Sequence, residues 1–129
     1  MCKPGRMCLP GTREERCITA YFDAFNAHDV EGVLACFRDD VTLVDVNDAQ
    51  IVGLDAARAL YAQEFESMPD AHCELVLASG HGGYGVAESV FHGTTRDGRV
   101  IEAVGAEVME FVDGRISVIR DYHRMRSGG

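Results

Sequence analysis

Basic residues are scarce in this sequence. Its 12 lysine and arginine residues stand against 21 aspartate and glutamate residues, which gives a net charge of −9 at pH 7. Nucleic acids and anionic membranes are bound through clusters of basic side chains. We therefore expect neither of them as a partner.

Long apolar segments are missing as well. No apolar run approaches the length that crosses a bilayer, and the N-terminal stretch MCKPGRMCLPGTREER lacks the apolar centre of a signal peptide. We therefore expect a cytoplasmic protein that does not enter a membrane.

Cysteine and histidine motifs are incomplete. The five cysteines include no C-x-x-C pair and no Cys/His spacing of a zinc site, and no H-E-x-x-H or H-x-x-x-H pattern occurs. We therefore expect neither a disulfide framework nor a metal site. Cys17, Cys36 and Cys73 lie among apolar residues and are interpreted as buried thiols, whereas Cys2 and Cys8 fall in a terminal arm.

The length and the apolar content suit a single domain. The chain has 129 residues, of which 47% are hydrophobic, and neither a repeat nor a linker divides it. We expect a flexible N-terminal arm at residues 1–11, one domain at residues 12–124 and a C-terminal tail at residues 125–129.

Three helices are predicted in the first half of the chain. A capping-box pattern, T-x-x-E, begins at Thr12 and precedes a helix of about residues 13–27 with apolar positions at helical spacing. Asp29 can cap a short second helix, whose apolar face is predicted to include Phe37. A third helix ends before Pro69.

Strands dominate the second half. After a β-branched stretch, VTLVD, and a brief second strand, the strand-like segments are residues 72–79, 84–95, 99–112 and 115–123. The breaks RDG and DG are typical of hairpins. Helices followed by an antiparallel meander indicate an α+β fold, in which helices lie across the mouth of a curved sheet and leave a pocket.

Glu107 is the one carboxylate in an otherwise apolar row of a predicted strand. Its neighbours on the same face are Ile101, Ala103, Gly105, Met109 and Phe111. If that face is buried, loss of solvation raises the pKa of Glu107 and keeps it protonated as a hydrogen-bond donor. The opposite face is also apolar, so the pattern alone leaves open which face points inward.

Asp45 and Tyr21 are two further candidates. Asp45 ends an apolar strand, so its carboxylate either lies next to the core or caps the following turn. Tyr21 lies on the apolar stripe of the first helix, where its hydroxyl either finds a buried partner or reaches water.

Three segments carry a resemblance to a known family. YFDAFNAHDVEGVLACFRDDVTLVD, GLDAARALY and DGRVIEAVGAEVMEFVDGRISVIRDY resemble ketosteroid isomerases and SnoaL-like polyketide cyclases of the nuclear-transport-factor-two-like superfamily, over residues 13–123. The resemblance implies a cone-shaped barrel of cystatin-like topology, in which three N-terminal helices close a strongly curved antiparallel sheet. It also implies a homodimer through the outer sheet face, where Val104, Ala106 and Val108 form an apolar row.

The resemblance to the isomerases also implies roles for single residues. Tyr21 matches their oxyanion-hole tyrosine, Asp45 their general base and Glu107 their protonated aspartic acid. In that chemistry a base moves a proton between carbons while two neutral donors hold the enolate oxygen. Glu107 departs from the pattern because its side chain is one methylene longer, which shifts the donated proton. Phe37 replaces a supporting tyrosine, while Tyr61 matches another one.

Asp121 is a second acid/base candidate. It matches an aspartate that SnoaL-like cyclases use, and His123 shares its face of the strand. Related epoxide hydrolases combine such an aspartate with an arginine and a second aspartate, but the corresponding stretch VAESVF has no arginine. An exposed Asp121 that pairs with Arg120 or Arg124 is equally compatible with the pattern.

The resemblance implies a cofactor-independent acid/base isomerase or cyclase that acts on a hydrophobic, ketone-bearing or polyketide-like small molecule. Epoxide opening by Asp45 or Asp121 with Glu107, and ligand binding without chemistry, are the alternatives. Neither a metal nor a cofactor is expected. Besides the four catalytic candidates, we expect substrate contacts from Phe25, Tyr61, Phe65, Val90, His92, Met109, Ile119 and His123.

Overall fold

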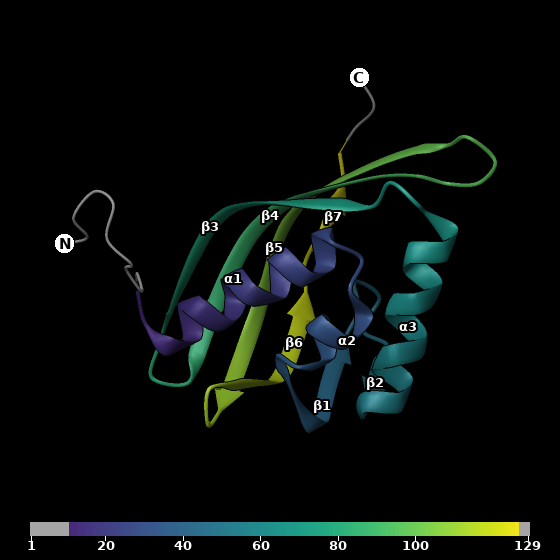
Figure 1. Cartoon of the computed structure of the whole chain (residues 1–129). Helices are drawn as coiled ribbons and strands as arrows, with labels where there is room; N and C mark the ends of the chain where they lie inside the picture. The colour runs from purple at the N-terminus through teal and green to yellow at the C-terminus, as the bar shows by residue number, and fades with distance from the viewer. Residues whose placement is uncertain (1–10, 127–129) are drawn as a thin grey trace, which may run out of the picture.

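The computed structural model describes residues 11–126, and Figure 1 shows its elements. Cys2, Cys8 and most of the predicted arm lie outside the described residues. In chain order the elements are α1 (Arg13–Asn26), α2 (Val30–Leu34), β1 (Phe37–Val44), β2 (Gln50–Val52), α3 (Leu54–Ser67), β3 (His72–His81), β4 (Tyr84–Thr94), β5 (Val100–Val112), β6 (Arg115–Asp121) and β7 (Arg124–Met125).

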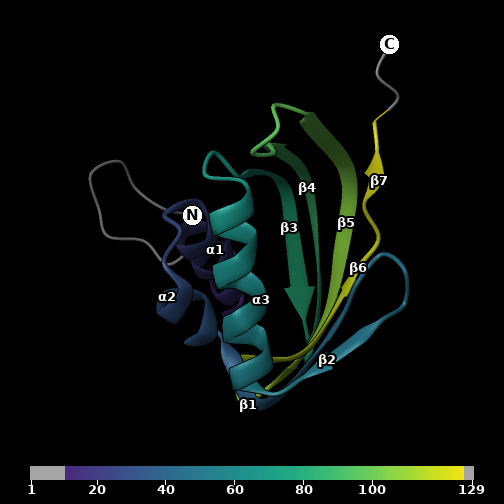
Figure 2. The ribbon, with the colours of Figure 1, turned by 90° about the vertical axis from the view of Figure 1, so that its right-hand side faces the viewer.

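The strands form one curved sheet with the three helices on its concave side (Figure 2). Its strand order is β2-β1-β6-β5-β4-β3, and β7 pairs with β5. The predicted α+β fold, three helices against a curved sheet, is confirmed.

Two details of the predicted sheet need correction. β1 and β6 pair in parallel, so the sheet is mixed and not purely antiparallel. β2 and β3 form its two edges, so the sheet is open and not a closed barrel. The parallel pair joins strands far apart in the sequence, and only neighbouring strands joined by a tight turn leave a local sequence signal.

The first helix forms as its sequence predicts. The Thr12 hydroxyl accepts a hydrogen bond from the Glu15 backbone N–H at 3.1 Å, and the Glu15 carboxylate accepts one from the Thr12 N–H at 3.0 Å. The second helix is shorter than expected, because Phe37 belongs to β1 and pairs with Ile116 of β6. Phe37 is 1% exposed there, so the apolar residue that we assigned to a helix face fills the core from a strand.

The core lies between α1 and the concave face of the sheet. The helix contributes Ile18, Tyr21, Phe22 and Phe25, and the sheet contributes Ala87, Met109, Phe111, Ile116 and Ile119. Burial of such large apolar side chains stabilises the fold by about 1.5–3 kcal/mol each. α3 stands farther along the concave face, and the space between α3 and the sheet holds the candidate site.

The C-terminal end of the described chain continues the sheet. β7 pairs with Ala103 and Val104 of β5, and the N–H of Arg126 donates to the carbonyl of Glu102 at 2.9 Å. Met125, the first residue of the expected C-terminal tail, is therefore paired in the sheet. None of the three helices within residues 11–126 has the length and hydropathy needed to traverse a bilayer.

Asn26 joins the end of α1 to the beginning of β3. Its side-chain amide donates to the carbonyl of Cys73 at 2.8 Å and accepts from the N–H of Cys73 at 2.7 Å. These two bonds hold α1, with Tyr21 and Phe25, against the edge of the sheet.

An Asn26→Ala variant tests this connection. Because both backbone groups of Cys73 lose their partner, we expect the free energy of unfolding to fall by about 2 kcal/mol or more in urea denaturation. Asn47→Ala, in the exposed turn after β1, is the matched control and should change it by less than about 0.5 kcal/mol. Equal stability of the two variants would contradict the role given to Asn26.

Candidate active site

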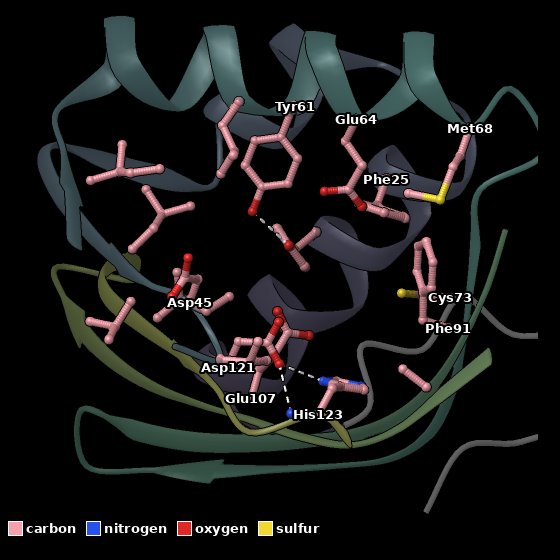
Figure 3. Close-up of a pocket in the computed structure, with 18 of the residues that line it drawn as sticks. Phe25, Asp45, Tyr61, Glu64, Met68, Cys73, Phe91, Glu107, Asp121 and His123 are labelled. Atoms are coloured by element: carbon pink, nitrogen blue, oxygen red, sulfur yellow. Dashed lines mark hydrogen bonds and ion pairs between the residues drawn. The ribbon is translucent and has the colours of Figure 1, made fainter. Parts of the chain in front are cut away.

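A cavity of about 420 Å³ lies between α3 and the concave face of the sheet (Figure 3). Its volume lies within the range of small-molecule sites, and its wall is mainly apolar. Polar groups reach it from the sheet and from the helices: Tyr21, Asp45, Tyr61, Glu64, Glu107, Asp121, His123 and Arg124.

Most of the predicted site residues meet at this cavity. All four catalytic candidates line it, together with four of the expected substrate contacts: Phe25, Tyr61, Ile119 and His123. These residues lie on α1, α3, β5 and β6 and just after β1 and β6, and the fold places them around one space.

Four expected substrate contacts lie elsewhere among the described residues. Phe65 and Met109 belong to the buried core. Val90 and His92 are on the outer face of β4, because Ala87 and Ser89 of the same strand are buried and alternate residues of a strand point to opposite faces. His92 pairs there with Glu102, at 3.2 Å.

The structure resolves which face of β5 points inward. Glu107 lines the cavity opposite Asp121 of β6, and the row Val104, Ala106 and Val108 lies on the outer face. Burial, followed by the negative charge of Asp121, raises the pKa of Glu107 to about 8, although the positive charge of His123 opposes this shift. Glu107 therefore carries a proton at pH 7.

Two buried tyrosines meet in the cavity wall. The hydroxyls of Tyr21 and Tyr61 are 2.7 Å apart, and their side chains are 3% and 4% exposed. Burial is the largest cause that raises the pKa of both phenols well above the usual value. Both remain neutral, and because one hydroxyl donates to the other, one O–H is left to donate to a ligand.

Asp121, His123 and Ser89 form a hydrogen-bonded chain. His123 Nδ1 lies 2.7 Å from the Asp121 carboxylate, and Nε2 lies 2.9 Å from the Ser89 hydroxyl and 3.2 Å from the Ser89 carbonyl. A carbonyl only accepts, so Nε2 carries a hydrogen, and in the protonated imidazole Nδ1 also donates, to the carboxylate. Burial alone would lower the pKa of His123, but the hydrogen bond and charge of Asp121 raise it. His123 is thus the counter-ion of Asp121.

Gly105 makes room for this chain. It lies between Ser89 of β4 and the end of β6 in the sheet, and a Cβ atom there would be 2.6 Å from the Cα of His123 and 2.5 Å from the carbonyl oxygen of Tyr122. Only glycine permits such a close approach. The imidazole of His123 therefore crosses β5 over Gly105 to reach Ser89.

Asp45 both caps a turn and borders the cavity. Its Oδ1 accepts from the backbone N–H groups of Asn47 at 2.8 Å and Ala49 at 2.9 Å, which leaves Oδ2 unused by these bonds. Asp45 thus caps the turn, and it is exposed at the border of the cavity and not next to the core. Asp121 also faces the cavity. Of its two suggested exposed partners, Arg120 pairs instead with Glu110 at 2.7 Å, and Arg124 lines the same cavity without an ion pair to Asp121 among the described residues.

A family match agrees with this arrangement. Residues 18–119, most of the chain, match the SnoaL-like domain family. The chain belongs to this family. The resemblance inferred from the sequence is therefore confirmed. No curated protein matches the chain.

Solved structures share the fold of this SnoaL-like domain. An LEH-like epoxide hydrolase from M. tuberculosis is 21% identical, with a TM-score of 0.78 over 90% of this chain and 86% of that chain. A candidate polyketide cyclase from Xanthomonas campestris pv. campestris is 21% identical, with a TM-score of 0.78 over 84% and 87%. A candidate SnoaL-like polyketide cyclase from Jannaschia sp. is 14% identical, with a TM-score of 0.77 over 94% and 91%. Such identities establish a common fold and not a common reaction.

Three residues of the SnoaL-like site were missed in the sequence. Glu64 follows Leu60 and Tyr61 at helical spacing, so its place on the cavity face of α3 could have been predicted. Ser89 and Gly105 carry no local signal, because their importance depends on the register of β4, β5 and β6. Within residues 11–126, no three His, Cys, Asp or Glu side chains are grouped so that they could hold a metal ion.

The charge pairing in the SnoaL-like site can be tested with Asp121→Asn. The amide keeps the size of the side chain but removes its charge, so the pKa of His123 should fall to its ordinary value of about 6.5 or lower. A pH titration of the imidazole nitrogens by ¹⁵N NMR measures it. Glu102→Gln, which removes the charge beside His92, is the control and should leave His123 unchanged. An unshifted His123 in Asp121→Asn would refute the pairing.

Proposed function

We propose that this protein is a cofactor-independent acid/base enzyme that isomerises or cyclises a hydrophobic, ketone-bearing or polyketide-like small molecule. The observation that carries the proposal is the raised pKa of Glu107, about 8, in a cavity that also holds the carboxyl groups of Asp45 and Asp121. A neutral acid beside candidate bases is the division of labour that proton transfer at carbon requires.

In the proposed reaction Asp45 is the base. Its free Oδ2 takes a proton from the carbon next to the substrate carbonyl, the C–H electron pair forms a C=C bond, and the carbonyl oxygen becomes an enolate. Glu107 and Tyr21 donate hydrogen bonds to that oxygen. Return of the proton to a second carbon completes an isomerisation. In a cyclisation the enolate carbon instead attacks a second carbonyl, whose C=O π bond breaks, and the resulting alkoxide takes the proton held by Asp45.

Asp121 is proposed as a second acid/base group. His123 holds Oδ1 of Asp121 through its ring and its backbone N–H, at 2.7 and 2.9 Å, and these bonds leave Oδ2 free. Both ring nitrogens of His123 are already in hydrogen bonds, so we assign it to positioning Asp121 and not to direct proton transfer.

Epoxide opening is the second candidate reaction. The observation that favours it is that the cavity is polar at both ends, with Glu64 on α3 and the pair Asp121–His123 on the sheet. Here Asp121 would remove a proton from a water molecule that attacks an epoxide carbon, while the C–O bond breaks and neutral Glu107 protonates the leaving oxygen.

The pH dependence of turnover tests the proposal. On a panel of bicyclic β,γ-unsaturated ketones, followed by NMR, we expect wild-type activity to fall as the pH rises through about 8, because Glu107 then loses the proton it donates. Glu107→Gln keeps an N–H donor but cannot ionise, so this alkaline decrease should disappear. Glu110→Gln, on the outer face, is the control and should retain it.

Asp45→Asn tests the base assignment on the same ketones. Loss of a general base should lower kcat by a factor of roughly 10²–10⁴. Full turnover by Asp45→Asn would refute the assignment. If the wild type binds these ketones without converting them, the family fold here serves ligand binding and not catalysis.

We also propose that the protein is a homodimer through the outer face of β5. Support comes from the row Val104, Ala106 and Val108, which is partly exposed on the side away from the helices. Light scattering should give twice the chain mass of 14.1 kDa, and Ala106→Glu should give a monomer with an unchanged circular dichroism spectrum. A wild type that is monomeric at high concentration would contradict this proposal.

A further inference from the structure

Glu64 is a cavity carboxyl that the proposed reaction does not use. It lies on α3, on the helix face that also presents Leu60, Tyr61 and Met68 to the cavity. Figure 3 shows its carboxyl group among Phe25, Tyr61 and Met68, directed into the cavity from the side opposite Glu107, Asp121 and His123.

No protein group satisfies this carboxyl within the described part of the chain. Among residues 11–126 the Glu64 side chain has neither a hydrogen bond nor an ion pair, although Asp121 on the sheet has His123 as its counter-ion. His28, the nearest cationic candidate on the helical side, bonds the carbonyl of Ala71 at 2.7 Å and stacks on Phe65 at 4.3 Å. Glu64 is half-buried, and a ligand that displaces the remaining water from its carboxyl must replace the lost hydrogen bonds.

The surroundings of Glu64 determine which ligand group would relieve this cost. Burial and the negative charge of Asp121 raise its pKa to about 7, while His28 acts weakly in the other direction. Glu107 and Asp45 add two more carboxyl groups to the same cavity. His123 and Arg124 line the same cavity, so the acids do not set its charge alone, but beside Glu64 a hydrogen-bond donor, and most strongly a cation, would be attracted to the carboxylate.

We propose that Glu64 binds a hydrogen-bond donor, a hydroxyl or an ammonium group, at the end of the substrate remote from its reacting carbonyl. The inference rests on the proposed function, because that function places the carbonyl oxygen at Tyr21 and Glu107. An apolar skeleton between the two ends then contacts Phe25, Phe91 and Met68. The substrate is accordingly an amphiphile with an acceptor at one end and a donor at the other.

Three matched probes test the proposal: 2-naphthylmethylamine, 2-naphthalenemethanol and 2-methylnaphthalene share one ring system and differ only in the donor. The protein contains no tryptophan, so naphthalene fluorescence reports binding without that background. At pH 8 we expect the wild type to bind at least one donor probe about tenfold or more tighter than the methyl probe, as a hydrogen bond to a charged group provides. Glu64→Gln should lose about tenfold for the amine and less for the alcohol, because its amide oxygen still accepts.

Glu66→Gln is the control. Glu66 lies two positions after Glu64 on the exposed side of α3, so this variant should bind all three probes like the wild type. Circular dichroism establishes that each variant is folded. A preference for the amine assigns an ammonium group, and a preference for the alcohol assigns a hydroxyl; both support the proposal. It is overturned if no donor probe exceeds the methyl probe in the wild type, or if the preference is the same in Glu64→Gln.

The binding test with these probes and the turnover test with Asp45→Asn can fail separately. If the donor preference disappears in Glu64→Gln while Asp45→Asn retains full turnover, the base assignment fails and the recognition by Glu64 stands. If Asp45→Asn is inactive and the donor preference is unaffected by Glu64→Gln, the base assignment stands and the recognition by Glu64 fails.

Discussion

Repulsion between carboxyl groups in a largely apolar cavity is the constraint on which this site depends. Glu107 and Asp121 are directly paired across β5 and β6, and both face the cavity. They are tolerated together because Glu107 keeps its proton and Asp121 has His123 as a counter-ion. Different surroundings thus give two neighbouring acids different charges, which is the condition for acid/base division of labour.

The fold supplies that condition through the sheet register and through one small residue. Register brings Glu107 opposite Asp121, and the absence of a side chain at Gly105 lets His123 reach across β5 to Ser89. The helices complete the enclosure and contribute the neutral hydroxyl pair of Tyr21 and Tyr61. Burial that stabilises the core therefore also removes water from the carboxyl groups and sets their protonation.

The sequence predicted the elements better than their long-range pairing. The capping box and helical spacing located α1 because those signals are local, whereas apolar residues on both faces of the strand left the direction of Glu107 open until the register of β5 resolved it. The parallel pairing of β1 with β6 has no local signal, so Phe37 was assigned to a helix and not to β1. His92 was placed inward because alternation identifies two faces of a strand but not which one is buried. Ser89 was missed because its partner, His123, comes from a distant strand.

The central claim is that Glu107 is neutral at physiological pH because the cavity and Asp121 disfavour its charge. A pH titration of the side-chain carboxyl carbons of the wild type by carbon-detected NMR measures this directly. The account predicts that the Glu107 carboxyl titrates near pH 8. Titration near pH 4, as exposed glutamates show, would contradict it, since Glu107 would then be charged and unable to donate a proton.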